Sequence, residues 1–266
     1  LEKRQLNLYC SSSKGSKSYW VFEALEKSWP YGTQRAHNEL ANNGIHVFWG
    51  LVGHNSINIK EVQKRQQPFI FIDMPYWGRW MPGMDPKDSY WRIVVNALHV
   101  NALEEKDNQR SKHIELKSEQ KKGEHILVCP SSLSLNQFYD QPRWLLGVCD
   151  KLKQVTDRPV KIREKPRSSR TSGPAVAKIP LEEDFKNAYC TVTMSSIVGV
   201  ESLIHGIPAI SEPFGPVGML GNNDISKIET VVLPERQQWL NTLSYNQWSV
   251  NEIEQGLPIN YILEKL

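Results

Sequence analysis

AYCTVTMSSIVGVESLIHGIPAIS, residues 188–211, is the stretch that decides the fold, because it predicts a strand, a tight turn, a helix, a turn and a second strand. Residues 189–194 are rich in β-prone side chains, and Ser195 and Ser196 then offer two hydroxyls that cap helices. Gly206 is a natural helix stop. The residues between have helical spacing, with one apolar face made by Val200, Leu203 and Ile204.

This strand–turn–helix arrangement has a chemical consequence. A helix starting at Ser196 directs unpaired backbone N–H groups and a positive dipole end outward from the carboxyl edge of the sheet. Phosphate groups bind at such helix starts in open α/β sheets. Glu201, about one turn further on, is placed to accept hydrogen bonds from a ribose diol. The plain alternative is an ordinary βαβ unit whose serines only cap the helix, and the motif shape alone does not decide between the two.

Residues 195–208, SSIVGVESLIHGIP, resemble the donor-site motif of GT-B glycosyltransferases. The pattern is most similar to S-S/T-x-x-G-x-E-A-L-x-x-G-x-P, found in capsule-type sugar transferases and related phage proteins. In that family the serines and the helix N-terminus hold the nucleotide phosphates and the glutamate binds the ribose. The resemblance therefore implies donor-binding roles for Ser195, Ser196 and Glu201, while Ser202 stands where the family usually has alanine.

The resemblance implies an α/β, GT-B-like fold of two Rossmann-like domains facing a central cleft. We expect an acceptor domain over residues 1–122, a nucleotide-sugar donor domain over 123–235, and a helical tail over 236–266 that crosses back to the first domain. The boundary is placed in residues 104–123, a highly charged stretch that we expect to be a linker plus a surface segment, and mobile.

Composition limits the remaining classes. The chain has 266 residues, 39% of them hydrophobic, and a net charge of +3. No run approaches the roughly 20 apolar residues of a membrane span. With no signal peptide visible, we expect a cytoplasmic protein, which the phage resemblance would place in the cytoplasm of an infected host cell. The four cysteines lack C-x-x-C spacing, which indicates reduced thiols and no zinc site.

A basic segment precedes the deciding stretch. PVKIREKP, residues 159–166, alternates strictly, so that its apolar side chains face one way and its cations the other. A solvated surface strand is the usual explanation of such a pattern. The order I-R-x-K-P also resembles the donor-phosphate segment of the same transferases, which implies that Arg163 and Lys165 bind the donor.

The first half offers candidates for acceptor chemistry. Asp73 ends the predicted strand PFIFID, and a carboxylate at a strand end in aromatic surroundings suits a general base. His54, after the predicted strand over 45–52, is the second candidate base. The alternative is that Asp73 caps a turn and the aromatic residues belong to the core. Arg79 and Arg92 are candidates for binding an anionic acceptor, and Trp77 is a candidate for stacking on a base.

The sequence thus predicts a metal-independent glycosyltransferase that needs no cofactor beyond its nucleotide-sugar co-substrate. A hydroxymethylated base in phage DNA is one candidate acceptor, because basic segments track phosphates and tryptophans stack on flipped bases. A capsular or cell-surface saccharide is the alternative acceptor. A nucleotide-sugar epimerase and a non-catalytic nucleic-acid-binding protein are the other two classes that the sequence leaves open. It does not give the sugar, the stereochemical outcome or the oligomeric state.

Overall fold

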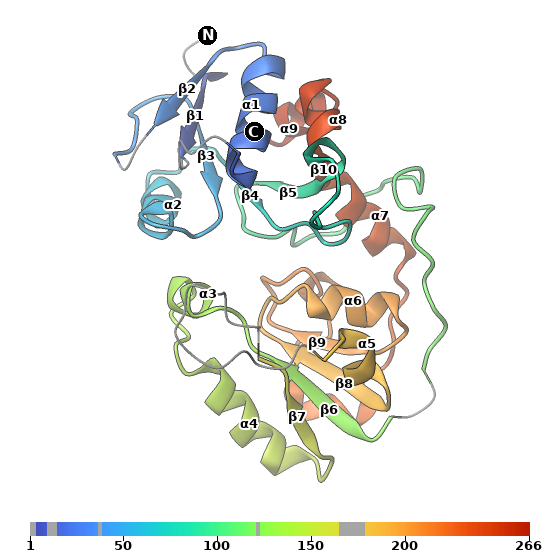
Figure 1. Cartoon of the computed structure of the whole chain (residues 1–266). Coiled ribbons are helices and arrows are strands. Elements are labelled where there is room, and N and C mark those ends of the chain that lie inside the picture. The colour runs from blue at the N-terminus through green and yellow to red at the C-terminus, as the bar shows by residue number, and fades with distance from the viewer. Residues whose placement is uncertain (1–3, 10–14, 37–38, 121–122, 165–178) are drawn as a thin grey trace. The chain divides into compact units, whose positions relative to one another are not determined.

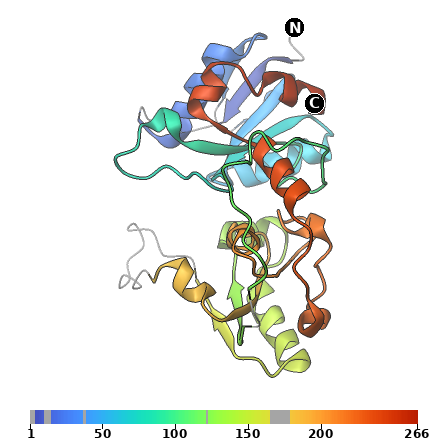
Figure 2. The same ribbon diagram turned by 90° about the vertical axis from the view of Figure 1, so that its right-hand side faces the viewer.

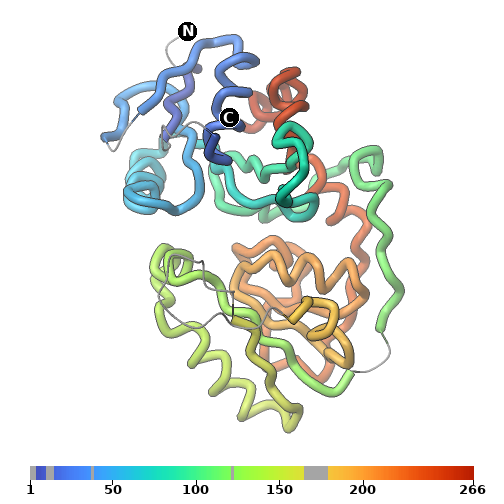
Figure 3. Tube along the Cα trace, in the orientation of Figure 1, coloured from blue at the N-terminus to red at the C-terminus, as the bar shows by residue number. Residues whose placement is uncertain are grey.

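The computed structural model describes residues 4–9, 15–36, 39–120, 123–164 and 179–266. The chain forms two compact units, the first made of residues 1–100 and 243–266 and the second of residues 101–242. The chain passes between the units near residue 100 and again within helix α7 (Figure 3). Lys165, a predicted donor-binding residue, lies outside the described residues.

The first unit is built on a mixed six-stranded sheet with the order β10-β5-β4-β3-β1-β2 (Figure 1). Strands β2, β1, β3 and β4 are parallel, β5 runs antiparallel to β4, and β10 runs antiparallel to β5. The strand bounds are β1 (Leu6–Tyr9), β2 (Thr33–Ala36), β3 (Ile45–Trp49), β4 (Phe69–Asp73), β5 (Tyr90–Val95) and β10 (Gln247–Ser249).

Helices cover both faces of this sheet. Alternate strand residues such as Leu8, Val47 and Ile72 pack with α1 (Lys17–Ser28), α8 (Val250–Glu254) and α9 (Ile259–Lys265) in one buried core. The crossovers through α1 and through α2 (Asn55–Lys64) progress in opposite directions along the sheet. Because such crossovers are right-handed, α2 lies on the opposite face. A short 3₁₀ turn, η2 (Pro86–Asp88), precedes β5.

The second unit has a four-stranded parallel sheet with the order β7-β6-β8-β9. Its strands are β6 (His125–Cys129), β7 (Val160–Ile162), β8 (Ala188–Thr193) and β9 (Ala209–Ser211). Helix α4 packs on one face through Trp144, Val148 and Leu152, and α5 and α6 pack on the other. The helices are α3 (Leu133–Phe138), α4 (Trp144–Val155), α5 (Leu181–Phe185), α6 (Val198–Ile204), η3 (Gly218–Leu220), η4 (Ile225–Thr230) and α7 (Gln237–Tyr245).

The direction of the chain through this second sheet reverses at β6. The chain first moves from β6 to β7 at one edge, then returns past β6 to β8 and β9. The loops after β6 and β8 therefore leave the carboxyl edge in opposite directions, and open α/β sheets bind their ligands at such a switch point. The predicted serines follow β8, so the fold places them there.

The charged segment before β6 is not the mobile linker that the sequence predicted. Residues 104–120 (green in Figure 2) form no strand, and they belong to the second unit. The amide of Lys117 donates to the carbonyl oxygen of Ile204 at 2.9 Å. Ser111 is 1% exposed and donates to Asn241 Oδ1 at 2.6 Å. Polar side chains, rather than an apolar face, anchor this segment.

The C-terminal tail also differs from the all-helical prediction, because β10 interrupts it and pairs with β5.

Among the described helices the longest, α1 and α4, have 12 residues each, and none is long and apolar enough to cross a membrane. The three described cysteines are unpaired thiols, and the described residues contain no cluster of His, Cys, Asp and Glu that could hold a metal ion.

Candidate functional site

Two serines meet at the switch point of the second unit. The amide of Ser195, after β8, donates to Ser131 Oγ, after β6, at 3.3 Å, and the two hydroxyl oxygens lie 3.4 Å apart. Ser195 is 1% exposed, whereas Ser131 is half-buried. The hydroxyl of the neighbouring Ser132 caps α3 by accepting from the Leu135 amide at 3.3 Å. Two polar loops are thus held together at the edge where ligands bind.

The start of α6 differs in detail from the prediction. The helix begins at Val198, two residues later than expected, and has seven residues. The amide of Ser196 donates to Thr193 Oγ1 at 2.9 Å, and Ser196 Oγ accepts from the Val198 amide at 3.3 Å. The amide of Ile197 has no acceptor among the residues that the structure describes. Ser196 therefore caps the turn, and a ligand here would meet the half-buried hydroxyls of Ser131 and Ser196 and one amide rather than a row of free N–H groups.

Tight packing fixes α6 against the sheet. A Cβ atom on Gly199 would lie 3.0 Å from Thr193 Cγ2 and 3.1 Å from Val217 Cγ2, so this position accepts only a very small residue. Ser202 is fully buried, and its hydroxyl lies 2.8 Å from Thr191 Oγ1 and donates to the carbonyl of Ile207 at 3.2 Å. The serine that replaces the usual alanine is thus hydrogen-bonded inside the fold.

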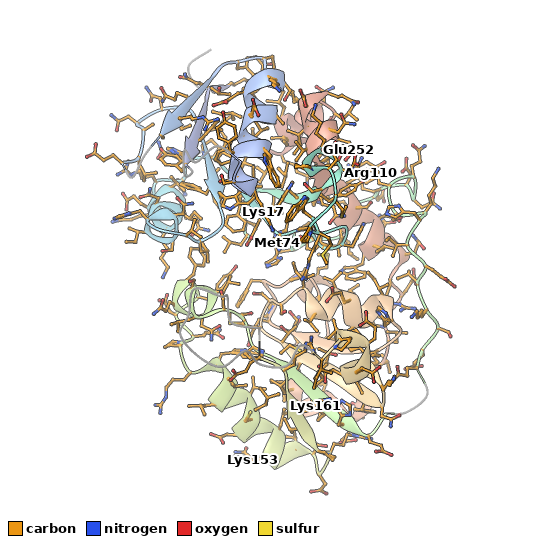
Figure 4. All side chains as sticks on the ribbon, in the orientation of Figure 1. Lys17, Met74, Arg110, Lys153, Lys161 and Glu252 are labelled. Atoms are coloured by element: carbon orange, nitrogen blue, oxygen red, sulfur yellow. The ribbon has the colours of Figure 1, made fainter. Side chains whose placement is uncertain are left out.

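Two cations in and directly after β7 are held by a buried carboxylate. Both Lys161 (labelled in Figure 4) and Arg163 form ion pairs with Asp184, whose side chain is 4% exposed. Burial alone would raise the pKa of Asp184, but its hydrogen bonds to these two cations outweigh burial and hold that pKa below its ordinary value. Arg163 Nη2 also donates to the carbonyl of Ile179 at 3.0 Å. Arg163 is therefore oriented by the protein, and its charge is shared with Asp184.

Cys129, the last residue of β6, is a buried thiol. Burial raises the pKa of Cys129 to about 12, and the charges of Arg163, Asp184 and Glu201 act on the same thiol. Arg163 directly follows β7, and Glu201 lies on α6, which follows β8, so these two predicted donor residues come from the elements that follow the two neighbours of β6. The raised pKa keeps Cys129 protonated near neutral pH, so it does not serve as a nucleophile.

In the first unit Asp73 lies at the end of β4 in a defined hydrogen-bond network. Its Oδ1 accepts from the Met74 amide at 2.7 Å, and its Oδ2 accepts from Arg92 Nη2 at 3.3 Å. The other arm of Arg92 lies 2.9 Å from His99 Nδ1. The side chain of Asp73 is 37% exposed and that of Arg92 is 4% exposed. The carboxylate thus reaches solvent while its orientation is set from inside the fold.

Arg92 was expected to contact an acceptor, but it lies inside the protein. Its guanidinium carbon lies 5.7 Å from the ring centre of Phe71 and 5.6 Å from that of Tyr76. His99 is also buried, and burial followed by the nearby Arg92 charge lowers its pKa well below the ordinary value. A neutral His99 accepts from Arg92, so this pair supports Asp73 and does not face an acceptor.

The other predicted acceptor-side residues follow the parallel strands β3 and β4. His54 is exposed at the start of α2, and its side chain does not cap the helix. Because β3 and β4 are parallel neighbours, Asp73 at the end of β4 and the loop after β3 that leads to His54 lie at adjacent strand ends. Trp77 is half-buried and its amide lies 3.3 Å from Gln247 Oε1, while Arg79 is exposed.

Ser131 is the residue of this site that sequence reasoning did not select. The signal was present in PSSLS, residues 130–134, which follows the buried strand HILVC. Such a polar loop becomes informative only once β6 and β8 are known to be neighbours, which the sequence alone does not show.

Comparison with known proteins finds solved structures with a similar fold. No family model matches the chain, and no curated protein matches it. A solved structure described as Thermosulfurimonas dismutans KpsC, β-Kdo 2,7-transferase, has a TM-score of 0.51 and 11% identity, covering 97% of this chain and 100% of its own. The KpsC β-Kdo 2,4-transferase of the same organism has a TM-score of 0.52 and 11% identity, covering 96% and 98%. At this identity the likeness establishes a shared α/β fold.

Proposed function

We propose that this protein is a GT-B-type glycosyltransferase that moves a sugar from a nucleotide-sugar donor to an acceptor hydroxyl. The observation that carries the proposal is the meeting of Ser131 and Ser195 at the switch point of the second sheet, with Arg163 directly after β7 and Glu201 on α6 after β8. This combination of hydroxyls, a carboxylate and a guanidinium suits a nucleotide: phosphates bind the hydroxyls and cation, and a ribose diol binds the carboxylate.

The two similar structures support this class, since both are described as Kdo transferases. Arg163 and Lys165 are proposed to neutralise the phosphate that leaves with the nucleotide, a role that protein cations fill without a metal ion. Donor-binding roles for Ser195 and Ser196 follow from their position and from the motif that they share with GT-B enzymes.

In the reaction proposed here, the acceptor hydroxyl oxygen attacks the anomeric carbon of the donor sugar. The bond between that carbon and the phosphate oxygen breaks, the nucleotide leaves with the electron pair, and the proton of the hydroxyl passes to a base. Asp73 is the proposed base, because its carboxylate is oriented by Met74 and Arg92 yet remains partly exposed. The exposed His54 is the second candidate.

A saccharide is the favoured acceptor. Trp91 is fully buried and Arg92 is 3% exposed, so neither is available to grip a flipped base or a DNA phosphate. The candidates Trp77 and Arg79 remain on the loop after β4, the strand that ends at Asp73. A modified base in phage DNA is therefore the weaker of the two acceptor proposals.

The test is binding of a panel of nucleoside mono- and diphosphates and nucleotide sugars, measured by thermal unfolding and titration calorimetry. A nucleotide present at about 100 times its Kd stabilises the native state by about 2.7 kcal/mol, which a melting curve resolves. Glu201→Gln should abolish the shift for the preferred nucleotide. Glu182→Gln, an exposed glutamate of α5 in the same unit, is the matched control and should leave it unchanged. If no nucleotide stabilises the protein, the proposal fails and a non-catalytic role gains weight.

A further inference from the structure

A lysine in the first unit lies against tryptophan rings. Lys17, the first residue of α1, has its Nζ 5.0 Å from the ring centre of Trp80 and 6.0 Å from that of Trp91. The rings of Trp20 and Trp80 lie 5.6 Å apart and are tilted by 56°. Lys17, Trp20 and Trp80, called the Lys17 cluster below, are half-buried, whereas Trp91 is fully buried beneath them.

Within the described ranges, no carboxylate forms an ion pair with the cation of this cluster. Among the ion pairs of the described residues none includes Lys17, whose contacts are with the two indole rings. Two other lysines of the same unit, Lys27 and Lys87, both pair with Glu254, at 3.0 and 3.1 Å. A half-buried cation without a counter-charge is available to an anionic ligand, and its position over aromatic faces restricts how that ligand approaches.

The cluster lies at the ligand-binding edge of its sheet. α1 follows the first parallel strand, so Lys17 stands near the carboxyl ends of the strands, where open α/β sheets bind ligands. Figure 4 shows Lys17 and Met74 at the same end of the first unit, and Met74 directly follows Asp73. Trp80 Nε1 donates to the carbonyl of Met84 at 3.1 Å, which fixes the indole plane.

We propose that the Lys17 cluster is a subsite for a carboxylate-bearing sugar ring of the acceptor. The apolar C–H face of a pyranose ring packs on an indole face, and a carboxylate on that ring pairs with the Lys17 ammonium. A neutral sugar would use only the indoles, and an inorganic anion only the ammonium. The inference rests on the proposed transferase function and names the chemical class of its acceptor.

The test compares methyl β-D-glucuronide, which carries a carboxylate at C6, with methyl β-D-glucoside, which carries a hydroxymethyl group there, using the 266-residue chain and saturation-transfer NMR with titration. We expect the glucuronide to bind about tenfold more tightly, equivalent to about 1.4 kcal/mol. Lys17→Gln should reduce the glucuronide to the affinity of the glucoside, and Trp80→Leu should weaken both. Lys265→Gln is the matched control, because Lys265 also lies over an aromatic ring, 4.7 Å from the centre of Tyr261, on α9.

Equal affinities for the two glycosides, absence of saturable glucuronide binding, or an unchanged preference in Lys17→Gln would each overturn the inference. Competition by a single-stranded oligonucleotide that is lost in Lys17→Gln would reassign the cluster to phosphate and overturn it as well. The binding assay needs no nucleotide. A protein that binds glucuronide through Lys17 but no nucleotide would therefore refute the transferase proposal alone, and the reverse result would refute the subsite alone.

Discussion

Arg92 and Asp73 lie opposite each other on the antiparallel strands β5 and β4, and Arg92 Nη2 donates to Asp73 Oδ2 at 3.3 Å. The guanidinium is buried and the carboxylate is partly exposed, so Arg92 orients Asp73 and does not contact solvent itself. The other terminal nitrogen of the guanidinium, Arg92 Nη1, lies 2.9 Å from His99 Nδ1. A chain of three polar side chains thus aims one carboxylate out of the sheet edge.

The first prediction concerns this pair. If Asp73 is the base, Asp73→Asn should lower kcat by at least about 100-fold while nucleotide affinity is unchanged, because general-base catalysis contributes roughly that much or more. Arg92→Lys should cause a smaller loss in kcat and a changed pH profile, since lysine keeps the charge without the two-armed geometry. Asp88→Asn, an exposed aspartate of η2, is the control. Equal activity of Asp73→Asn and wild type would remove Asp73 from the mechanism.

The second prediction concerns Ser131. Ser131→Ala removes the acceptor of the Ser195 amide, and an unsatisfied buried amide costs about 1–3 kcal/mol. We expect a lower melting temperature and about tenfold weaker nucleotide binding by calorimetry. Ser134→Ala, on the exposed side of α3, should change neither quantity. If Ser131→Ala binds the nucleotide as tightly as wild type, the donor site does not include the Ser131–Ser195 contact.

The third prediction uses two glycines with similar backbone geometry. Gly206 has φ = +79° and Gly221 has φ = +85°. A Cβ on Gly206 would collide with the carbonyl of Ser118, whereas a Cβ on Gly221 meets nothing within 4 Å. Gly221→Ala should therefore cost only the left-handed strain of about 1–2 kcal/mol. Gly206→Ala should cost clearly more and should release residues 117–120, which hydrogen exchange would detect. Equal losses would show that the docking of this segment contributes no stability.

The fourth prediction is a pH dependence of the first unit. Burial, followed by the charge of Arg65, lowers the pKa of His46 from 6.5 to about 4, and the side chain is fully buried. Below pH 6.5 the His46 imidazole is protonated in the unfolded chain but stays neutral in the folded chain. The free energy of unfolding therefore falls as the pH drops towards 4. The loss amounts to about 3 kcal/mol.

The measurement for His46 is denaturant unfolding between pH 7 and pH 4, followed by exchange of amides in the first unit. His46→Gln should flatten the curve, although His99, whose pKa is also lowered, retains part of the slope. If His46→Gln follows the same pH dependence as wild type, His46 does not control acid stability.

The sequence by itself determined the local elements around residues 188–211. Strand, helix and strand appear in the order that β-prone side chains, helical spacing and Gly206 predicted, with the helix starting two residues later, because each signal acts within one or two turns of chain. The strands ending at Asp73 and near Trp49 were predicted for the same reason. Short or polar strands such as β2 and β10 lacked an apolar run, and only pairing with a neighbour defines them.

Tertiary structure alone decided which of these residues meet. Ser131 and Ser195 are 64 positions apart and become partners through the order of β6 and β8. Alternation could not tell that the face of β5 carrying Arg92 would be covered by Phe71 and Tyr76, which turned an expected surface cation into a buried one. The polar segment 104–120 carries no apolar pattern, and it is ordered by side-chain hydrogen bonds to distant residues such as Asn241. Sequence patterns report local preference, whereas burial and pairing of polar groups depend on what the rest of the chain places beside them.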